Sequence, residues 1–190
     1  PKLTRMSENH AYYVQVNYSD TLFDGHAEIE GNPGFTGNTL SQRAESASID
    51  YGGFWISESL SRVNNPALAV DRLLGTVYHR AAFLAPGTRY LGYAQGTTER
   101  PVDVFTALTF ADIVEGDTPL QGVVYPAPGM RAVPTFFLNK LEKPNPFPEH
   151  DGVGYPISMH FPRYRDTESN GEPKLLIGEF TLYEGSTLIE

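Results

Sequence analysis

Apolar positions recur at helical spacing along the first half of the chain. Within residues 3–18 one helical face collects Leu3, Met6, His10, Tyr13, Val14 and Asn17, and this spacing predicts an amphipathic helix. Thr39 is a suitable N-cap for a short second helix over residues 40–48, whose Ala44 and Ala47 are expected to face inward.

Two further helical segments are predicted between residues 65 and 84. Asn65 followed by Pro66 is a strong helix start, because a capping side chain precedes a proline at the first helical position. The apolar face of that helix is expected to consist of Leu68, Val70, Leu73 and Leu74. Gly75 predicts its end, and a short helical turn over residues 78–84 stops at Pro86.

The second half shows the short apolar runs and alternation typical of strands. Residues 90–95, 102–109, 156–161 and 175–183 are predicted strands, and they are rich in aromatic side chains. Residues 122–154 form a long proline-rich loop. A loop of that length is unusual in a compact domain unless it is functional or packed down, and its aromatic side chains favour an ordered coat.

Composition changes near Gly96 and supports a division of the chain there. Residues 1–100 hold 4 of the 15 prolines and a net charge of −2, whereas residues 101–190 hold 11 prolines and a net charge of −7. We therefore expect an α+β protein with a helical part over residues 1–96 and a β-rich, proline-rich extension over residues 97–190. The extension is expected to pack on the sheet or to continue it.

Charge and cysteine content exclude several functions. The total charge of −9 argues against a nucleic-acid partner, and no apolar run approaches the length of a membrane span. The chain contains no cysteine, so disulfides, thiolate metal sites and a cysteine nucleophile are excluded. Because the chain begins at Pro1, we interpret it as a processed or trimmed product.

The candidate chemistry lies in the histidines. His10 is expected to be packed in the first helix, His150 to be solvated beside Glu149 and Asp151, and His160 to face either way in its strand. The acidic cluster that includes Glu142 is likewise expected to be a solvated loop.

His26, Glu58 and His79 form a more specific combination. The two histidines are expected at helix ends, and Glu58 is embedded in an apolar–polar segment, where a buried carboxylate needs a partner. Two imidazoles and a carboxylate suit a divalent metal such as zinc. They also suit a hydrogen-bonded network without a catalytic role, and their spacing does not choose between the two.

The order of motifs over residues 3–96 resembles bacterial members of the CAP superfamily, which comprises the cysteine-rich secretory proteins, antigen 5 and the pathogenesis-related 1 proteins. The similar segments are His10–Tyr13 with Asn17, Gly25–Glu28, the loop and short helix at Gly31–Ala44, Ser57–Leu60, Ala69–Asp71, Val77–Leu84 and Gly92–Tyr93. Residues 124–157 resemble, less specifically, a β-rich extension that follows some bacterial CAP domains.

The resemblance implies an α/β/α sandwich with a small antiparallel sheet and a polar cleft lined by His26, Glu58 and His79. His26 and His79 would be the metal-binding pair. Many family members carry a second cleft glutamate, for which Asp71 and Glu28 are candidates only by sequence position. The usual Gly-Glu-Asn is Ser57-Glu58-Ser59 here, and the usual Ser-Pro before the second histidine is Thr76-Val77. Such changes affect the groups that orient metal ligands.

Three hypotheses for function follow. The first is an exported binding module, extracellular or at the cell envelope, whose partner is a small molecule, a lipid or a cell-wall component. The second is a zinc-assisted hydrolase of a peptide or cell-wall substrate, in which Glu58 is the catalytic general base. The third is a purely structural polar network.

Overall fold

The computed structural model describes residues 2–17, 25–50, 52, 54–63, 65–96, 105–114, 122–142, 144–161, 163–164, 181–184 and 186–189. The helices are α1 (Lys2–Asn17), α2 (Leu40–Ser46), α3 (Pro66–Gly75), α4 (Val77–Leu84) and the 3₁₀ turn η1 (Asn139–Leu141). The strands are β1 (Phe54–Ser61), β2 (Thr88–Gln95), β3 (Phe105–Val114), β4 (Val123–Tyr125), β5 (Ser158–His160), β6 (Arg163–Tyr164), β7 (Leu182–Glu184) and β8 (Thr187–Ile189).

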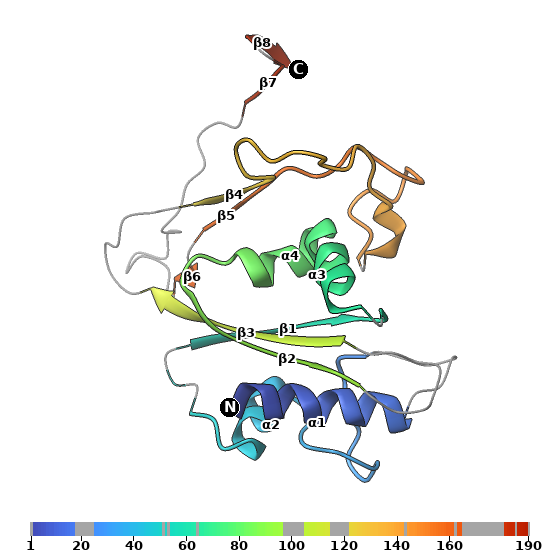
Figure 1. Cartoon of the computed structure of the whole chain (residues 1–190), viewed down its shortest axis with the longest axis vertical. Coiled ribbons are helices and arrows are strands. Elements are labelled where there is room, and N and C mark those ends of the chain that lie inside the picture. Colours follow the sequence, from blue (N-terminus) through green and yellow to red (C-terminus); the bar gives the residue numbers. More distant parts are fainter. Residues whose placement is uncertain are drawn as a thin grey trace.

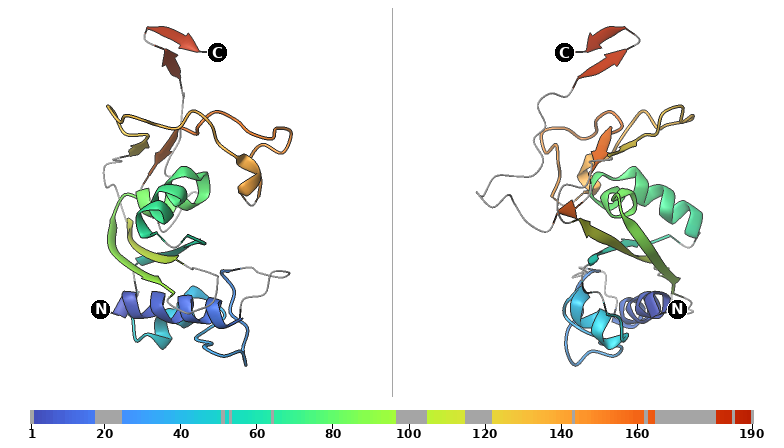
Figure 2. Two further views of the ribbon diagram at one scale, coloured as in Figure 1. Left: turned by 45° about the vertical axis from the view of Figure 1, so that its right-hand side comes forward. Right: turned by 90° about the vertical axis from the view of Figure 1, so that its left-hand side faces the viewer.

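A small sheet in the order β1-β3-β2 lies between two helical layers (Figure 1). Strand β3 pairs antiparallel with both neighbours, and β6 adds a short parallel pairing at the end of β3. Helices α1 and α2 cover one face and α3 and α4 the other, as the turned views also show (Figure 2). The predicted α+β class is confirmed. Among the described residues, no helix has the length and apolar character to cross a bilayer.

Each helical layer has its own apolar core. On the α1 side, Met6 packs with Ala44 and Ala47, so the inward-facing alanines of the predicted second helix are confirmed. On the opposite side, Ala69 and Leu73 of α3 pack with Val63.

The helix starts follow the sequence signals. Thr39 forms a capping box with Gln42, and the Asn65 side chain accepts from the backbone of Leu68. A capping bond satisfies a backbone N–H that has no partner within the helix. The prediction that Leu68 belongs to the apolar face is wrong, because its side chain is 43% exposed. A cap fixes where a helix begins, but the neighbouring layers decide which side becomes buried.

Strand β1 departs from the expectation of helices joined by loops in the first part. Residues 54–61 pair with β3 along their whole length. Serine alternates with larger side chains here, so the segment lacks the dense apolar content usual for a buried strand. The strand forms because its backbone pairs with β3, which is distant in sequence, and the local sequence pattern does not predict that pairing.

The predicted strands of the second half are confirmed in part. Strand β2 spans residues 88–95, β3 begins at residue 105 and β5 is limited to residues 158–160. Most of the predicted strand over 175–183 lies outside the described residues. Within the long proline-rich loop, Phe137 is buried and bridges to Val153, whereas Phe136 and Phe147 are exposed. The aromatic coat is therefore only partly packed.

Arg80 of α4 joins this second half to the helical part. Its side chain is fully buried. Nε donates to the carbonyl of Leu74 at 2.8 Å, and Nη1 donates to the carbonyl of Pro156 at 2.8 Å. The guanidinium lies 4.6 Å from the ring centre of Tyr125 and 5.1 Å from that of Tyr155. A desolvated guanidinium on two aromatic faces is a stabilising arrangement.

We predict that Gly92→Ala destabilises the protein by about 1–3 kcal/mol, the usual range for overpacking. A Cβ at Gly92 would lie 2.6 Å from the backbone of Leu3, so α1 must move away from β2. Gly75→Ala is the control, because a Cβ there meets nothing within 4 Å. Urea unfolding of both variants checks this, and equal stabilities would contradict the close approach of α1 and β2.

Candidate functional site

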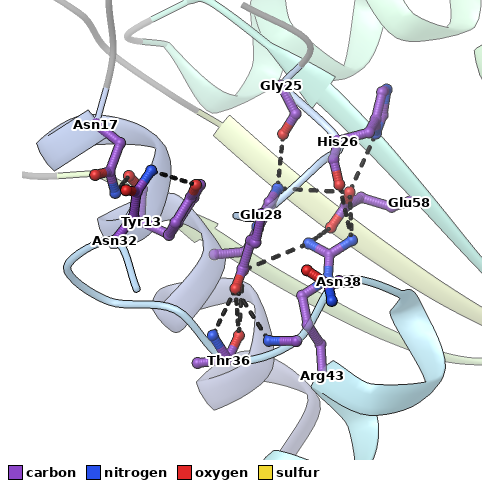
Figure 3. A network of polar contacts seen from close by, with 12 residues as sticks. Tyr13, Asn17, Gly25, His26, Glu28, Asn32, Thr36, Asn38, Arg43 and Glu58 are labelled. Atoms are coloured by element: carbon purple, nitrogen blue, oxygen red, sulfur yellow. Dashed lines mark hydrogen bonds and ion pairs between the residues drawn. The ribbon is translucent and has the colours of Figure 1, made fainter. Parts of the chain in front are cut away.

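Glu58 lies at the centre of a buried polar network (Figure 3). Strand β1 directs its side chain to the face covered by α1 and α2, where it is 2% exposed. Arg43 Nη1 donates to Oε2 at 2.9 Å, and Arg43 Nη2 donates to Oε1 at 3.1 Å. His26 Nδ1 lies 3.1 Å from Oε1. Both oxygens of the carboxylate are therefore occupied by protein donors.

Helix α2 holds Arg43 in this position. Its capping box fixes the start of the helix, and the Arg43 side chain is 3% exposed. Nη2 also donates to the carbonyl of His26 at 3.3 Å, so the same guanidinium fixes both the backbone and, through Glu58, the ring of that histidine. A bidentate arginine–carboxylate pair adds orientation as well as energy.

His10 and Glu28 extend the network beneath α1. His10 is fully buried, which confirms that it is packed, and its ring nitrogens lie 2.8 Å from Glu28 Oε1 and 2.8 Å from the carbonyl oxygen of Gly25. Glu28 also accepts from the backbone N–H groups of Thr36 at 2.6 Å and Gly37 at 3.2 Å. The Gly25 carbonyl and the Glu28 carboxylate are both hydrogen-bond acceptors, and an imidazole ring with N–H groups on both nitrogens satisfies the two of them.

The network favours the charged form of both carboxylates. Burial raises the pKa of Glu58, but the hydrogen bond from His26 and the charges of His10 and Arg43 outweigh it, so that its pKa lies below the ordinary value. Burial also raises the pKa of Glu28, and the bonds from His10 and Thr36 reverse that effect. Each carboxylate is thus held ionised by its partners.

His79 belongs to a second group of polar residues. It follows the end of α3 and lies in the first turn of α4, close to the helical turn that the sequence predicts over residues 78–84. Its Nδ1 lies 3.0 Å from Thr76 Oγ1 and 4.0 Å from Glu142 Oε2. Burial lowers the pKa of His79, Glu142 opposes this, and the charge of His26 lowers it further.

The predicted trio is thus brought together in part. His26 and Glu58 are in contact, whereas the polar contacts of His79 are with Thr76 and Glu142. The His26 side chain is 48% exposed and that of His79 is 31% exposed. These two rings are the accessible members, while Glu58 is enclosed.

The expectation that Glu142 lies in a solvated loop is wrong. Its side chain is 1% exposed and accepts from the backbone N–H groups at the start of α4. Glu28 pairs with His10 beneath α1, and Asp71 lines a separate cavity of about 420 Å³ between α3 and β2. His150 is exposed, as expected.

Arg43 was also missed, although the sequence carried a signal for it. Once Thr39 fixes the start of α2, Arg43 lies one turn before Ala47 on the side that also carries Ala44. A charged side chain on an apolar helix face indicates a buried partner. Glu142 had no comparable local signal.

Across the described ranges, no group of three or more histidine, aspartate or glutamate side chains is arranged to hold a metal ion. Glu58 uses both oxygens on protein donors, which makes it a poor additional ligand. His26 and His79 supply the imidazole nitrogens that zinc accepts.

Comparisons with protein-family models, with curated protein sequences and with solved structures return no match.

We predict that Glu58→Gln lowers the free energy of unfolding by about 3–5 kcal/mol at pH 7, the usual cost of breaking a buried ion pair. Glu45→Gln on the exposed side of α2 is the matched control. Because folding lowers the pKa of Glu58 and Glu28, their contribution is full above the ordinary value of 4.5 and is lost as the pH falls through their folded pKa values. Urea unfolding between pH 3 and pH 7 measures both effects. If the free energy of unfolding of Glu58→Gln fell between pH 7 and pH 3 by as much as that of the wild type, the result would contradict the network.

Proposed function

We propose that the chain is an exported bacterial domain of the CAP superfamily that serves as a binding module at the cell envelope. Support comes from the ordered motifs over residues 3–96 and from an antiparallel sheet with helices on both faces. On this proposal the sheet and its two helical layers are the family's α/β/α sandwich, and the part of the chain after residue 96 supplies its central strand β3 as well as the proline-rich segment. The ligand is a small molecule, a lipid or a cell-wall component.

The orientation of the two accessible histidines carries this proposal. Thr76 donates its hydroxyl hydrogen to the carbonyl of Leu73 at 2.9 Å, so Oγ1 accepts the Nδ1–H of His79. The carboxylate of Glu58 likewise accepts the Nδ1–H of His26. In each neutral ring the lone pair therefore lies on Nε2, the usual arrangement when another group fixes a metal-binding histidine.

A divalent metal such as Zn²⁺ is the proposed cofactor, with His26 and His79 as its protein ligands. When bound, such an ion supplies a Lewis acid that can hold an oxygen atom of a ligand. Glu58 orients His26, and Thr76 orients His79. Only two protein ligands are proposed, so the remaining coordination positions are left for water or for the ligand of the module.

The environment of Glu58 favours binding over hydrolysis. A general base must accept a proton near neutral pH, but the pKa of Glu58 lies below that of an ordinary carboxyl group and both oxygens are engaged by Arg43 and His26. Glu58 is therefore better suited to hold the histidine loop than to activate water. A structural role for Glu58 and a binding role for the two histidines are compatible.

We predict that the protein binds Zn²⁺ and that His26→Ala and His79→Ala each weaken binding by more than about tenfold, because even the loss of an outer-sphere partner costs about 10–100-fold. Isothermal titration calorimetry with zinc chloride measures the change.

His150→Ala is the control for that titration, since His150 is exposed in a different loop. Zinc that binds the native state must also raise the melting temperature, and a chelator must reverse the increase. Equal affinities for the wild type, His26→Ala and His79→Ala would contradict the proposed metal ligands.

A further inference from the structure

Glu142 supplies the side-chain cap of α4 from the other half of the chain. The N-cap residue of α4 is Thr76, yet its side chain makes no capping hydrogen bond. Instead, Glu142 Oε1 accepts from the backbone N–H groups of Val77 and, at 3.4 Å, Tyr78. A carboxylate at a helix N-terminus satisfies free N–H groups and complements the positive end of the helix dipole.

Because Glu142 caps α4 in place of the Thr76 side chain, the Thr76 hydroxyl is available to bond His79. A threonine at an N-cap ordinarily turns its oxygen toward the third N–H of the helix. Because Glu142 occupies the start of α4, Thr76 instead donates to the carbonyl of Leu73 and accepts from His79 Nδ1. The hydrogen bond at Nδ1 of His79 therefore depends on Glu142, which is far away in the sequence.

The second oxygen of Glu142 acts on His79 directly. Oε2 lies 4.0 Å from Nδ1, and the Glu142 side chain is 1% exposed. A negative charge in a desolvated place attracts a proton strongly. It therefore favours the tautomer with hydrogen on Nδ1, which is the nitrogen nearer to it, and leaves the lone pair on Nε2.

The loop that carries Glu142 is held in place by two other buried residues. Asn139 is fully buried, and its Nδ2 donates to Asn145 Oδ1 and to the carbonyls of Phe147 and His150. Arg80, next to His79 on α4, holds the carbonyl of Pro156. The segment thus contacts α4 on both sides of the histidine.

From this geometry we propose that Glu142 is the positioning residue that keeps His79 in its Nδ1–H tautomer. Both halves of the chain then contribute to the binding site. His26 and His79 come from the first half, and Glu142, which sets the tautomer of His79, comes from the second. This inference rests on the proposed function, in which Nε2 of His79 meets the ligand.

The test is the tautomer of His79 in Glu142→Gln, read from long-range ¹H–¹⁵N correlation spectra of ¹⁵N-labelled full-length protein without metal. The spectra are recorded at a pH where the ring is neutral, and His79→Gln assigns the signal. A glutamine retains an acceptor for α4 but places an amide NH₂ near Nδ1. We expect Nδ1–H in the wild type and in the control Glu149→Gln, and a change to predominantly Nε2–H in Glu142→Gln.

Two results would overturn the role of Glu142. One is a wild-type ring protonated on Nε2, which decides the question even if Glu142→Gln does not fold. The other is an unchanged Nδ1–H tautomer in a folded Glu142→Gln. Calorimetry with zinc then separates this inference from the proposed function: a wild type that binds no zinc refutes the metal site, while the tautomer still decides what Glu142 does.

Discussion

The buried ion pair between Arg43 and Glu58 is the interaction on which the arrangement around the first histidine depends. It joins α2 to β1, and through hydrogen bonds from the same two side chains it fixes both the backbone and the ring of His26. Breaking such a pair leaves an uncompensated charge in a desolvated place. The Arg43 guanidinium faces both carboxylates, Glu58 at 2.9 Å and Glu28 at 3.8 Å, and the His10 ring contacts Glu28.

Helix α4 has the corresponding role for the second histidine. It is short and lacks a cap from its own N-cap side chain, and the second half of the chain supplies one through Glu142. Arg80, one residue after His79, anchors the same half through Pro156 and two tyrosine rings. The sheet also mixes the two parts, since β3 lies between β1 and β2. A compositional boundary near Gly96 is therefore compatible with a site that both parts build.

Features fixed by neighbouring residues were predictable from the sequence, and features fixed by distant ones were not. The starts of α2 and α3 followed from Thr39 and Asn65, because a cap is a local hydrogen bond. The exposure of Leu68 and the strand over residues 54–61 depended on which layers and strands lie beside them. The sequence predicted His26 and Glu58 together with His79, and the structure shows the first two in contact. Arg43 could be placed beside them only after Thr39 had fixed which side of α2 faces inward. The burial of Glu142 could not be predicted, because it depends on how the long loop folds back onto α4.

The central claim is that His26 and His79 meet one ligand through Nε2 while Glu58 remains paired with Arg43. Anomalous diffraction at the zinc absorption edge, on crystals grown with and without zinc chloride, tests it most directly. The account predicts one zinc-dependent peak in contact with Nε2 of both histidines and an intact pair between Arg43 and Glu58. A peak on Glu58 with Arg43 displaced, or zinc bound to neither histidine, would contradict it.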